Sequence, residues 1–193
     1  GKNQEAAQAY EQAIGLEPDN IQNHLGLGVV LLRAGKYEQA LETYNRVLAL
    51  APDNEQAYKI ITGILVDQQR YTEAIQLLQP VIKQYPQLTE LQLQLANALL
   101  FQGNETAAIQ TLELAKKNDP QNHLIYLQTG DILYQQKNLD GALTEYQQAA
   151  RLRSDAATAF EGRGTIYVAK QDYLQAILAF GRLTEISPNN RGG

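Results

Sequence analysis

Few residues of this chain have types and spacings that could support catalysis. His24 and His123 are the only histidines, they lie far apart in the sequence, and there is no cysteine. The chain also lacks a glycine-rich phosphate loop, an HExxH motif and a nucleophile elbow. His24 occupies a recurring structural position and His123 begins a predicted helix, so we interpret both as structural. The sequence therefore predicts no enzymatic activity, cofactor, metal site or small-molecule substrate.

Charge and hydropathy narrow the classes of partner. The formal net charge is −5, with acidic and basic residues interspersed. No basic stripe is present, so nucleic acid is not a predicted partner. The longest apolar run, from Leu25 to Leu32, contains Gly26 and Gly28 and is far shorter than a membrane span requires.

The elements that position the side chains are set by a 34-residue period. A proline recurs at Pro18, Pro52, Pro86, Pro120 and Pro188, with Ser154 at the one position where it is missing. An alanine recurs at the same period, at Ala6, Ala40, Ala74, Ala108, Ala142 and Ala176. Two series with one period indicate stacked copies of a single supersecondary unit.

Residues 21–54 show what this unit is. The first half has the pattern of a helix that ends near Arg33, and Gly35 supplies the backbone freedom of a tight turn. The second half has the i, i+3, i+4, i+7 apolar spacing of a second helix, which Pro52 ends. Asn54 can then cap the next helix. The unit is therefore predicted to be a helix–turn–helix.

Small residues are predicted to let the two helices of a unit approach closely. The alanine series supplies this position in the second helix. A series of mostly small residues supplies it in the first helix, at Gly28, Thr62, Ala96, Gly130 and Gly164.

The unit resembles the tetratricopeptide repeat. Its characteristic positions are occupied in residues 21–54 by His24, Leu27, Gly28, Leu31, Gly35, Tyr37, Ala40, Tyr44 and Pro52. The resemblance implies an all-α, right-handed α-solenoid of stacked helix–turn–helix units. It covers 1–193 as a single solenoid with a half-repeat at 1–20 and repeats at 21–54, 55–88, 89–122, 123–156 and 157–190. Because the chain opens within a repeat and has no methionine, we expect it to be a piece of a longer protein.

Four positions depart from the repeat pattern, and two interpretations stay open. Gln92, Glu105, Thr129 and Arg163 stand where apolar or aromatic residues are expected. In one interpretation these positions are partly exposed in shorter or looser helices. In the other, Arg163 pairs with a carboxylate such as Asp131 and sets the pitch between the last two repeats.

The resemblance implies that the first helices line a concave groove. The residues predicted to face it are Leu25, Val29, Leu32, Arg33, Lys59, Glu90, Leu93, Asn97, Leu100, Phe101, Leu124, Leu127, Asp131, Tyr134 and Glu161. Its apolar members would form a larger exposed patch than monomers usually carry, which favours a groove for an apolar or amphipathic peptide segment. The alternative is that superhelical curvature lets these residues cover one another.

The charges of this groove predict the orientation of a bound peptide. Arg33 and Lys59 lie in its earlier part, and Glu90, Asp131 and Glu161 in its later part, an arrangement that would orient a bound peptide.

Chaperone-binding members of the family grip a terminal carboxylate with two lysines, an arginine and two asparagines. Lys59 matches the first of these positions, but the others hold Gly63, Gln94, Leu124 and Gln128. Heat-shock protein tails are therefore not predicted partners.

The resulting prediction is a non-catalytic protein–protein interaction module, an adapter or assembly factor with a protein or peptide partner. Two alternatives stay open: end-to-end self-association through residues 1–20 or around Ile177, Phe180 and Leu183, and regulation of an enzyme domain outside this chain. The glutamine-rich, lysine-poor repeats also resemble bacterial, particularly cyanobacterial, family members, some of which are membrane-tethered assembly factors of photosynthetic complexes. Localisation is not predicted, although a membrane-tethered bacterial parent is consistent with that resemblance.

Overall fold

The computed structural model describes residues 2–187, and within them every regular element is an α-helix. The helices are α1 (Lys2–Leu16), α2 (Ile21–Arg33), α3 (Tyr37–Leu50), α4 (Glu55–Asp67), α5 (Tyr71–Gln84), α6 (Thr89–Phe101), α7 (Glu105–Asn118), α8 (His123–Gln135), α9 (Leu139–Leu152), α10 (Ala157–Ala169) and α11 (Tyr173–Ile186). The predicted all-α solenoid of helix–turn–helix units is confirmed. Each full repeat holds a first helix, from α2 to α10 in even numbers, and a second helix, from α3 to α11 in odd numbers.

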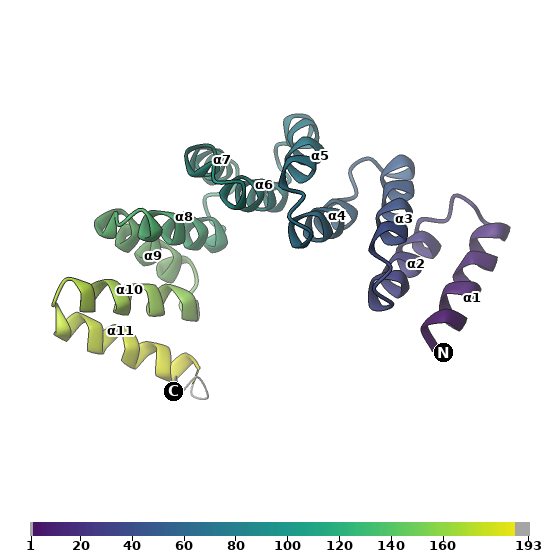
Figure 1. The fold of residues 1–193 in the computed structure, drawn as a ribbon. Helices are drawn as coiled ribbons and strands as arrows, with labels where there is room; N and C mark the ends of the chain where they lie inside the picture. Colours follow the sequence, from purple (N-terminus) through teal and green to yellow (C-terminus); the bar gives the residue numbers. More distant parts are fainter. Residues whose placement is uncertain (1, 188–193) are drawn as a thin grey trace. The chain divides into compact units, whose positions relative to one another are not determined.

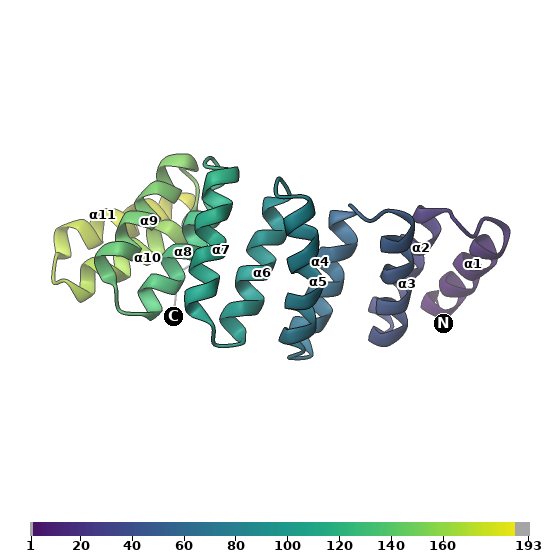
Figure 2. The ribbon, with the colours of Figure 1, turned by 90° about the horizontal axis from the view of Figure 1, so that it is seen from above.

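The helices fall into two compact units (Figure 1). Unit 1 spans residues 1–104 and contains α1 to α6, and unit 2 spans 105–193 and contains α7 to α11. Within each unit, consecutive helices pack side by side, as α2 does with α3 and α8 does with α9 (Figure 2). In the described part of the chain, no helix is long and apolar enough to cross a membrane.

The turn inside each repeat places one residue in the left-handed region. Gly35 and Gly103 have φ of 72° and 88° at this position, as a glycine readily does. The other three repeats use residues with a side chain, namely Gln69, Lys137 and Gln171, at φ of 59°, 61° and 59°. The repeat therefore imposes this conformation even where glycine is missing.

Asparagine side chains cap three of the first helices, as the sequence predicts for Asn54. Its Oδ1 accepts a hydrogen bond from the Ala57 amide at 2.9 Å. Asn20 and Asn122 cap α2 and α8 in the same way. Leu88 and Ala156 precede α6 and α10 and make no side-chain cap bond.

The small residues admit large side chains from the paired helix. In the alanine series, Ala40, Ala74, Ala108 and Ala142 are fully buried. A Cβ atom added to Gly28 would lie 2.6 Å from the Tyr44 ring, and Gly164 faces Phe180 at the same distance. Each aromatic ring thus fills the space that a glycine 16 residues earlier leaves open.

A side-chain hydrogen bond accompanies the proline series. Six positions after each of four prolines of the series, a side chain donates to that proline's carbonyl oxygen: His24 to Pro18, Tyr58 to Pro52, Gln92 to Pro86 and Tyr126 to Pro120. Phe160, the fifth residue of this series, has no such donor, and it follows Ser154, where the proline is missing. This contact supports the structural interpretation of His24.

The interpretation that the unusual residues sit in loose, exposed helices is wrong for Gln92 and Thr129. Gln92 is fully buried, and Thr129 is 1% exposed with its hydroxyl donating to the Ile125 carbonyl oxygen. Both side chains find backbone acceptors, so polar groups are tolerated at these core positions.

The predicted ion pair between Arg163 and Asp131 is also wrong. The guanidinium of Arg163 lies over the Phe160 ring, 5.3 Å from its centroid, and its Nε is buried without a hydrogen-bond partner. Asp131 instead accepts a hydrogen bond from Tyr146. A tyrosine hydroxyl therefore takes the place that the arginine was expected to fill.

Candidate functional site

The residues predicted to face a groove in unit 1 differ in exposure. Arg33, Lys59 and Phe101 are exposed, whereas Leu25, Val29, Leu32, Glu90, Asn97 and Leu100 are half-buried. Leu93 is only 5% exposed, so its expected place on an open surface is corrected. Its helix, α6, contacts α4 as well as α5, which leaves this side chain little access to water.

Two predicted residues of unit 1 meet as an ion pair. Lys59 Nζ on α4 lies 3.4 Å from Glu90 Oε1 on α6. The pair links consecutive first helices, so the two side chains lie beside each other on α4 and α6. Because each charge neutralises the other, the predicted separation of positive and negative charge along the groove is smaller at Lys59 and Glu90. Arg33, which is also exposed, is the other cation of the predicted set.

Phe101 occupies the end of this face near the repeat turns. Its ring stacks on Tyr71 of α5, with 5.9 Å between the ring centroids and an interplanar angle of 18°. Although the side chain is 58% exposed, this stacking holds it against a second helix. Phe101 therefore borders the first-helix face of unit 1.

In unit 2, three predicted residues line one cavity of about 180 Å³. Asp131 and Tyr134 come from α8, and Glu161 comes from α10. Residues outside the predicted set complete the lining: Tyr146, Thr158, Gly162 and Thr165. Of the remaining predicted residues, Leu124 is 42% exposed and Leu127 packs against the buried cluster of unit 2.

A hydrogen bond joins two of the residues that line this cavity, Tyr146 and Asp131. Tyr146 donates its hydroxyl to Asp131 Oδ1 at 2.6 Å. Burial raises the pKa of Asp131, and the hydrogen bond from Tyr146 opposes that rise. Burial also raises the pKa of Tyr146. The neighbouring groups Asp131, Tyr134 and Glu161 raise it as well, so all three lie close enough to affect the Tyr146 hydroxyl.

Sequence reasoning missed Tyr146, although a signal was present. A Cβ atom added to Gly130 would lie 2.8 Å from the Tyr146 ring, and one added to Gly162 would lie 2.5 Å away. The ring is therefore held between α8 and α10 by glycines 16 residues before and after it. The same spacing joins Tyr10 to Gly26, so a tyrosine with a glycine 16 residues later indicates this packing.

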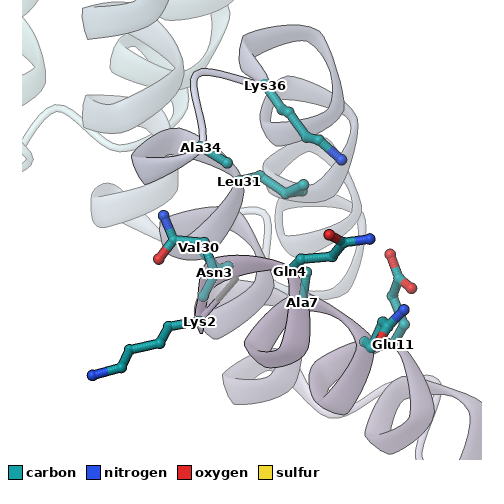
Figure 3. Close-up of a pocket in the computed structure, with 10 residues that line it drawn as sticks. Lys2, Asn3, Gln4, Ala7, Glu11, Val30, Leu31, Ala34 and Lys36 are labelled. Atoms are coloured by element: carbon teal, nitrogen blue, oxygen red, sulfur yellow. The ribbon is translucent and has the colours of Figure 1, made fainter.

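A second cavity lies away from the predicted face. It has a volume of about 590 Å³ in unit 1 and lies between α1 and the end of α2 (Figure 3). Residues such as Gln4 and Ala7 line it from α1, while Leu31, Ala34 and Lys36 line it from α2 and the turn that follows. None of the predicted site residues contributes to this lining.

A missing hydrogen bond explains why the space is wide. In the later repeats, the residue after the first helix donates to the start of the preceding second helix: Gln68 to Glu38, Gln102 to Thr72, Gln136 to Glu105 and Lys170 to Asp140. Ala34 occupies this position in the first full repeat and has no side-chain donor. The corresponding cavity one repeat later, which Arg70 lines, is about 280 Å³. We therefore attribute the larger cavity to local packing.

The described residues offer no group of three or more histidine, aspartate or glutamate side chains suited to a metal ion. The cavity of unit 2 instead combines two carboxylates, two tyrosines and two threonines. Such a lining can accept hydrogen bonds and attract a cation.

Solved structures with the same fold include PilF of Pseudomonas aeruginosa, with 21% identity, a TM-score of 0.71 and coverage of 98% of this chain and 96% of that chain. YrrB, described as a TPR protein with an unusual peptide-binding site, has 21% identity, a TM-score of 0.62 and coverage of 96% and 95%. Yeast Tom70 has 16% identity and a TM-score of 0.78, over 94% of this chain and 39% of that chain. At these identities the likeness shows the fold alone. No curated protein matches the sequence.

Family models match nearly the whole chain. Models described as tetratricopeptide repeat match residues 1–63, 65–129 and 157–190, and one described as TPR repeat matches 130–171. The 34-residue period, the helix pairs and these matches agree, so the chain belongs to the tetratricopeptide repeat family, whose fold supports protein–protein interaction.

Proposed function

We propose that this chain is a non-catalytic interaction module whose first helices hold an apolar or amphipathic segment of a partner protein. One recurring position carries the proposal. It is apolar in all five first helices, at Leu32, Val66, Leu100, Tyr134 and Val168. None of the five is fully buried, and Tyr134 and Val168 are 38% and 47% exposed.

This pattern favours a binding surface because the packing of the repeats leaves the position partly or largely open to water. The alanine positions of the second helices are fully buried, or nearly so, in all five full repeats. An apolar position that recurs with the same period but stays partly open to water gains further hydrophobic stabilisation when a partner covers it. A segment held in this way is bound through many modest contacts, and an affinity near 1 µM, about −8 kcal/mol, is expected. A module of this kind would act as an adapter or assembly factor.

A peptide-binding measurement with surface variants tests the proposal. An array of 15-residue apolar and amphipathic peptides is probed with the chain, and bound peptides are titrated by fluorescence anisotropy. Tyr134→Asp and Val168→Asp are expected to weaken binding at least tenfold with an unchanged melting temperature, because they place charge on the apolar face. Tyr173→Asp is the matched control, since Tyr173 is 61% exposed but belongs to the second helix α11. Unchanged binding by the first two variants would contradict the proposal.

Self-association is a second candidate, favoured by an observation on α11. Leu174 and Leu178 are 67% and 59% exposed, beside Ile177 at 68%. The positions equivalent to Leu174 hold Glu38, Thr72, Thr106 and Asp140, and those equivalent to Leu178 hold Glu42, Gln76, Gln110 and Thr144. In α1 the equivalents are Gln4 and Gln8. An apolar α11 matches a second α11 better than it matches α1, so we infer a two-fold contact between copies.

A further inference from the structure

We propose that the cavity between α8 and α10 binds the guanidinium group of an arginine in the partner segment. The inference rests on the proposed function and names the side chain that anchors the segment in unit 2. We call this space, lined by Asp131, Tyr134, Tyr146, Thr158, Glu161, Gly162 and Thr165, the α8–α10 cavity.

The size of the cavity favours a single side chain. Its volume of about 180 Å³ is below the roughly 300 Å³ at which pockets for whole small molecules begin. Tyr134 borders it and also occupies the recurring apolar position of α8, so a segment lying on that position can reach the cavity. The cavity is therefore continuous with the surface proposed to bind the segment.

The charge of the lining favours a cation. Asp131 and Glu161 are the charged residues of the lining, and both are acidic. Glu161 makes no side-chain hydrogen bond or ion pair with the described residues, and Tyr146 engages only Oδ1 of Asp131. Arg163, a cation on α10 itself, lies over Phe160 instead. A cation from a partner would thus meet two carboxylates that no described basic side chain neutralises.

The aromatic rings favour arginine over lysine. A guanidinium can pair with a carboxylate through two parallel N–H···O bonds and can also stack on an aromatic face. The α8–α10 cavity offers carboxylates from two helices and the partly exposed ring of Tyr134. An ammonium group would use the charge but not the planar geometry.

One of the two carboxylates, that of Asp131, is held in place before any partner binds. The Tyr146 ring is 3% exposed and fixed between Gly130 and Gly162, and its hydroxyl holds Asp131. A side chain that is already ordered loses little further entropy on binding. Tyr146 is a positioning residue in this arrangement.

Matched peptides test the proposal directly. The probes are fluorescein-labelled 15-residue amphipathic peptides with leucines on one helical stripe and one central arginine, lysine or citrulline. Citrulline keeps the shape of arginine without its charge. The arginine peptide is expected to bind wild type about tenfold more tightly than the citrulline peptide, with lysine between them. In ¹⁵N-labelled protein, the arginine peptide is expected to shift the amide resonance of Gly162.

Variants separate this cavity from general attraction between an acidic protein and a basic peptide. Glu161→Gln is expected to remove most of the arginine preference while leaving the affinity for the citrulline peptide unchanged. Glu113→Gln removes the same charge from α7, where Glu113 is 53% exposed, and is expected to change neither affinity. Asp131→Asn keeps an acceptor for Tyr146 and is expected to act as Glu161→Gln does.

Each result has a defined meaning. Equal affinities for the arginine and citrulline peptides overturn the arginine site but leave the proposed function standing. A preference that survives in the Asp131→Asn, Glu161→Gln double variant also overturns it. If arginine methyl ester shifts Gly162 at the same concentrations as the arginine peptide, the cavity binds a free cation rather than a docked segment. Failure of all three peptides and of the whole array to bind contradicts the proposed function as well.

Discussion

Tyr44 and Tyr146 occupy the same position of their repeats, yet only one of them finds a partner for its hydroxyl. Tyr146 reaches Asp131, which lies 15 residues earlier in the chain. The residue at that spacing from Tyr44 is Val29, and the Tyr44 hydroxyl is buried without a hydrogen bond. Burial alone raises the pKa of Tyr44. One position of the repeat can thus be purely structural or part of a polar site, depending on its neighbour.

Replacing each tyrosine by phenylalanine is expected to have opposite effects. Tyr44→Phe removes an unsatisfied buried hydroxyl, so the free energy of unfolding is expected to stay the same or rise by about 1 kcal/mol. Tyr146→Phe leaves Asp131 without its hydrogen-bond donor and is expected to lower the free energy of unfolding by about 1–2 kcal/mol. Urea unfolding of both variants measures the difference. Equal effects would show that the hydrogen bond to Asp131 contributes nothing to stability.

Asp131 is expected to make stability depend on pH. Its folded-state pKa lies above the ordinary aspartate value of 3.8, so the folded state binds this proton more tightly than the unfolded state does. Asp131 therefore contributes stability at low pH and loses that contribution as pH rises from 3.8 through its folded pKa. The free-energy difference between wild type and Asp131→Asn should become less favourable to wild type over this window.

Chemical denaturation of both proteins from about pH 3 to pH 7 measures this dependence, and carboxyl NMR titration reports the pKa itself. In Tyr146→Phe the pKa of Asp131 should rise further, because the hydrogen bond that opposes the rise is lost. Glu161 and Tyr134 remain present in all three proteins. A pKa of Asp131 at or below the ordinary value contradicts the prediction.

At the scale of the helix pair, the repeats differ in the residue that adopts the left-handed conformation in the turn. Gly35→Ala is expected to lower the free energy of unfolding by about 1–2 kcal/mol, because alanine is strained at a φ of 72°. A Cβ atom at Gly35 would meet no atom within 4 Å, so the loss measures backbone strain alone.

Gly63→Ala is the matched control for this substitution. Gly63 lies inside α4, and its added Cβ would also meet no atom within 4 Å. Here alanine is expected to raise the free energy of unfolding by up to about 1 kcal/mol, because it favours the helix. Thermal unfolding followed by circular dichroism compares the two variants. Two changes of the same sign would contradict the assignment of strain to the turn.

The helix pairs could be predicted from the sequence because their determinants recur. Pro52 and Ala40 act within one repeat, and the proline and alanine series place residues with the same roles in the other repeats. The positions that could not be predicted depend on contacts between helices. Leu93 is buried because α6 also meets α4, and the Arg163 guanidinium lies over Phe160 rather than reaching Asp131.

Three residues of the α8–α10 cavity belong to the set that the sequence predicts to face a groove. Asp131, Tyr134 and Glu161 follow from the face of their helices, which the period fixes. Tyr146 comes from a second helix and reaches the cavity only because Gly130 and Gly162 leave room for its ring. The resemblance to the tetratricopeptide repeat implies that first helices line the groove, and α9 is a second helix, so it gave no reason to place a side chain of α9 in a site.

Within each unit, the helix pairs with the larger contacts among the described residues are near neighbours in the chain, which is the property that makes repeat proteins modular. Polar links between repeats follow the same rule within each unit. Lys116 of α7, for example, lies 2.7 Å from Glu145 of α9 in unit 2. A self-association surface can therefore arise from substitutions within one repeat, and a partner site such as the α8–α10 cavity from substitutions within two consecutive repeats.

The surface of α11 provides the prediction for the molecule as a whole. If two copies meet through this helix, Leu174→Gln and Leu178→Gln together should weaken self-association, because they restore the polar character that these positions have in the other second helices. The matched control is Leu114→Gln on α7, where the leucine is 45% exposed. Sedimentation equilibrium over a roughly hundredfold range of concentration measures the dimer fraction of each protein. Wild type that stays monomeric throughout, or a control that weakens association equally, contradicts the α11 contact. A concentration-dependent dimer that the α11 variant alone abolishes assigns the contact to this helix.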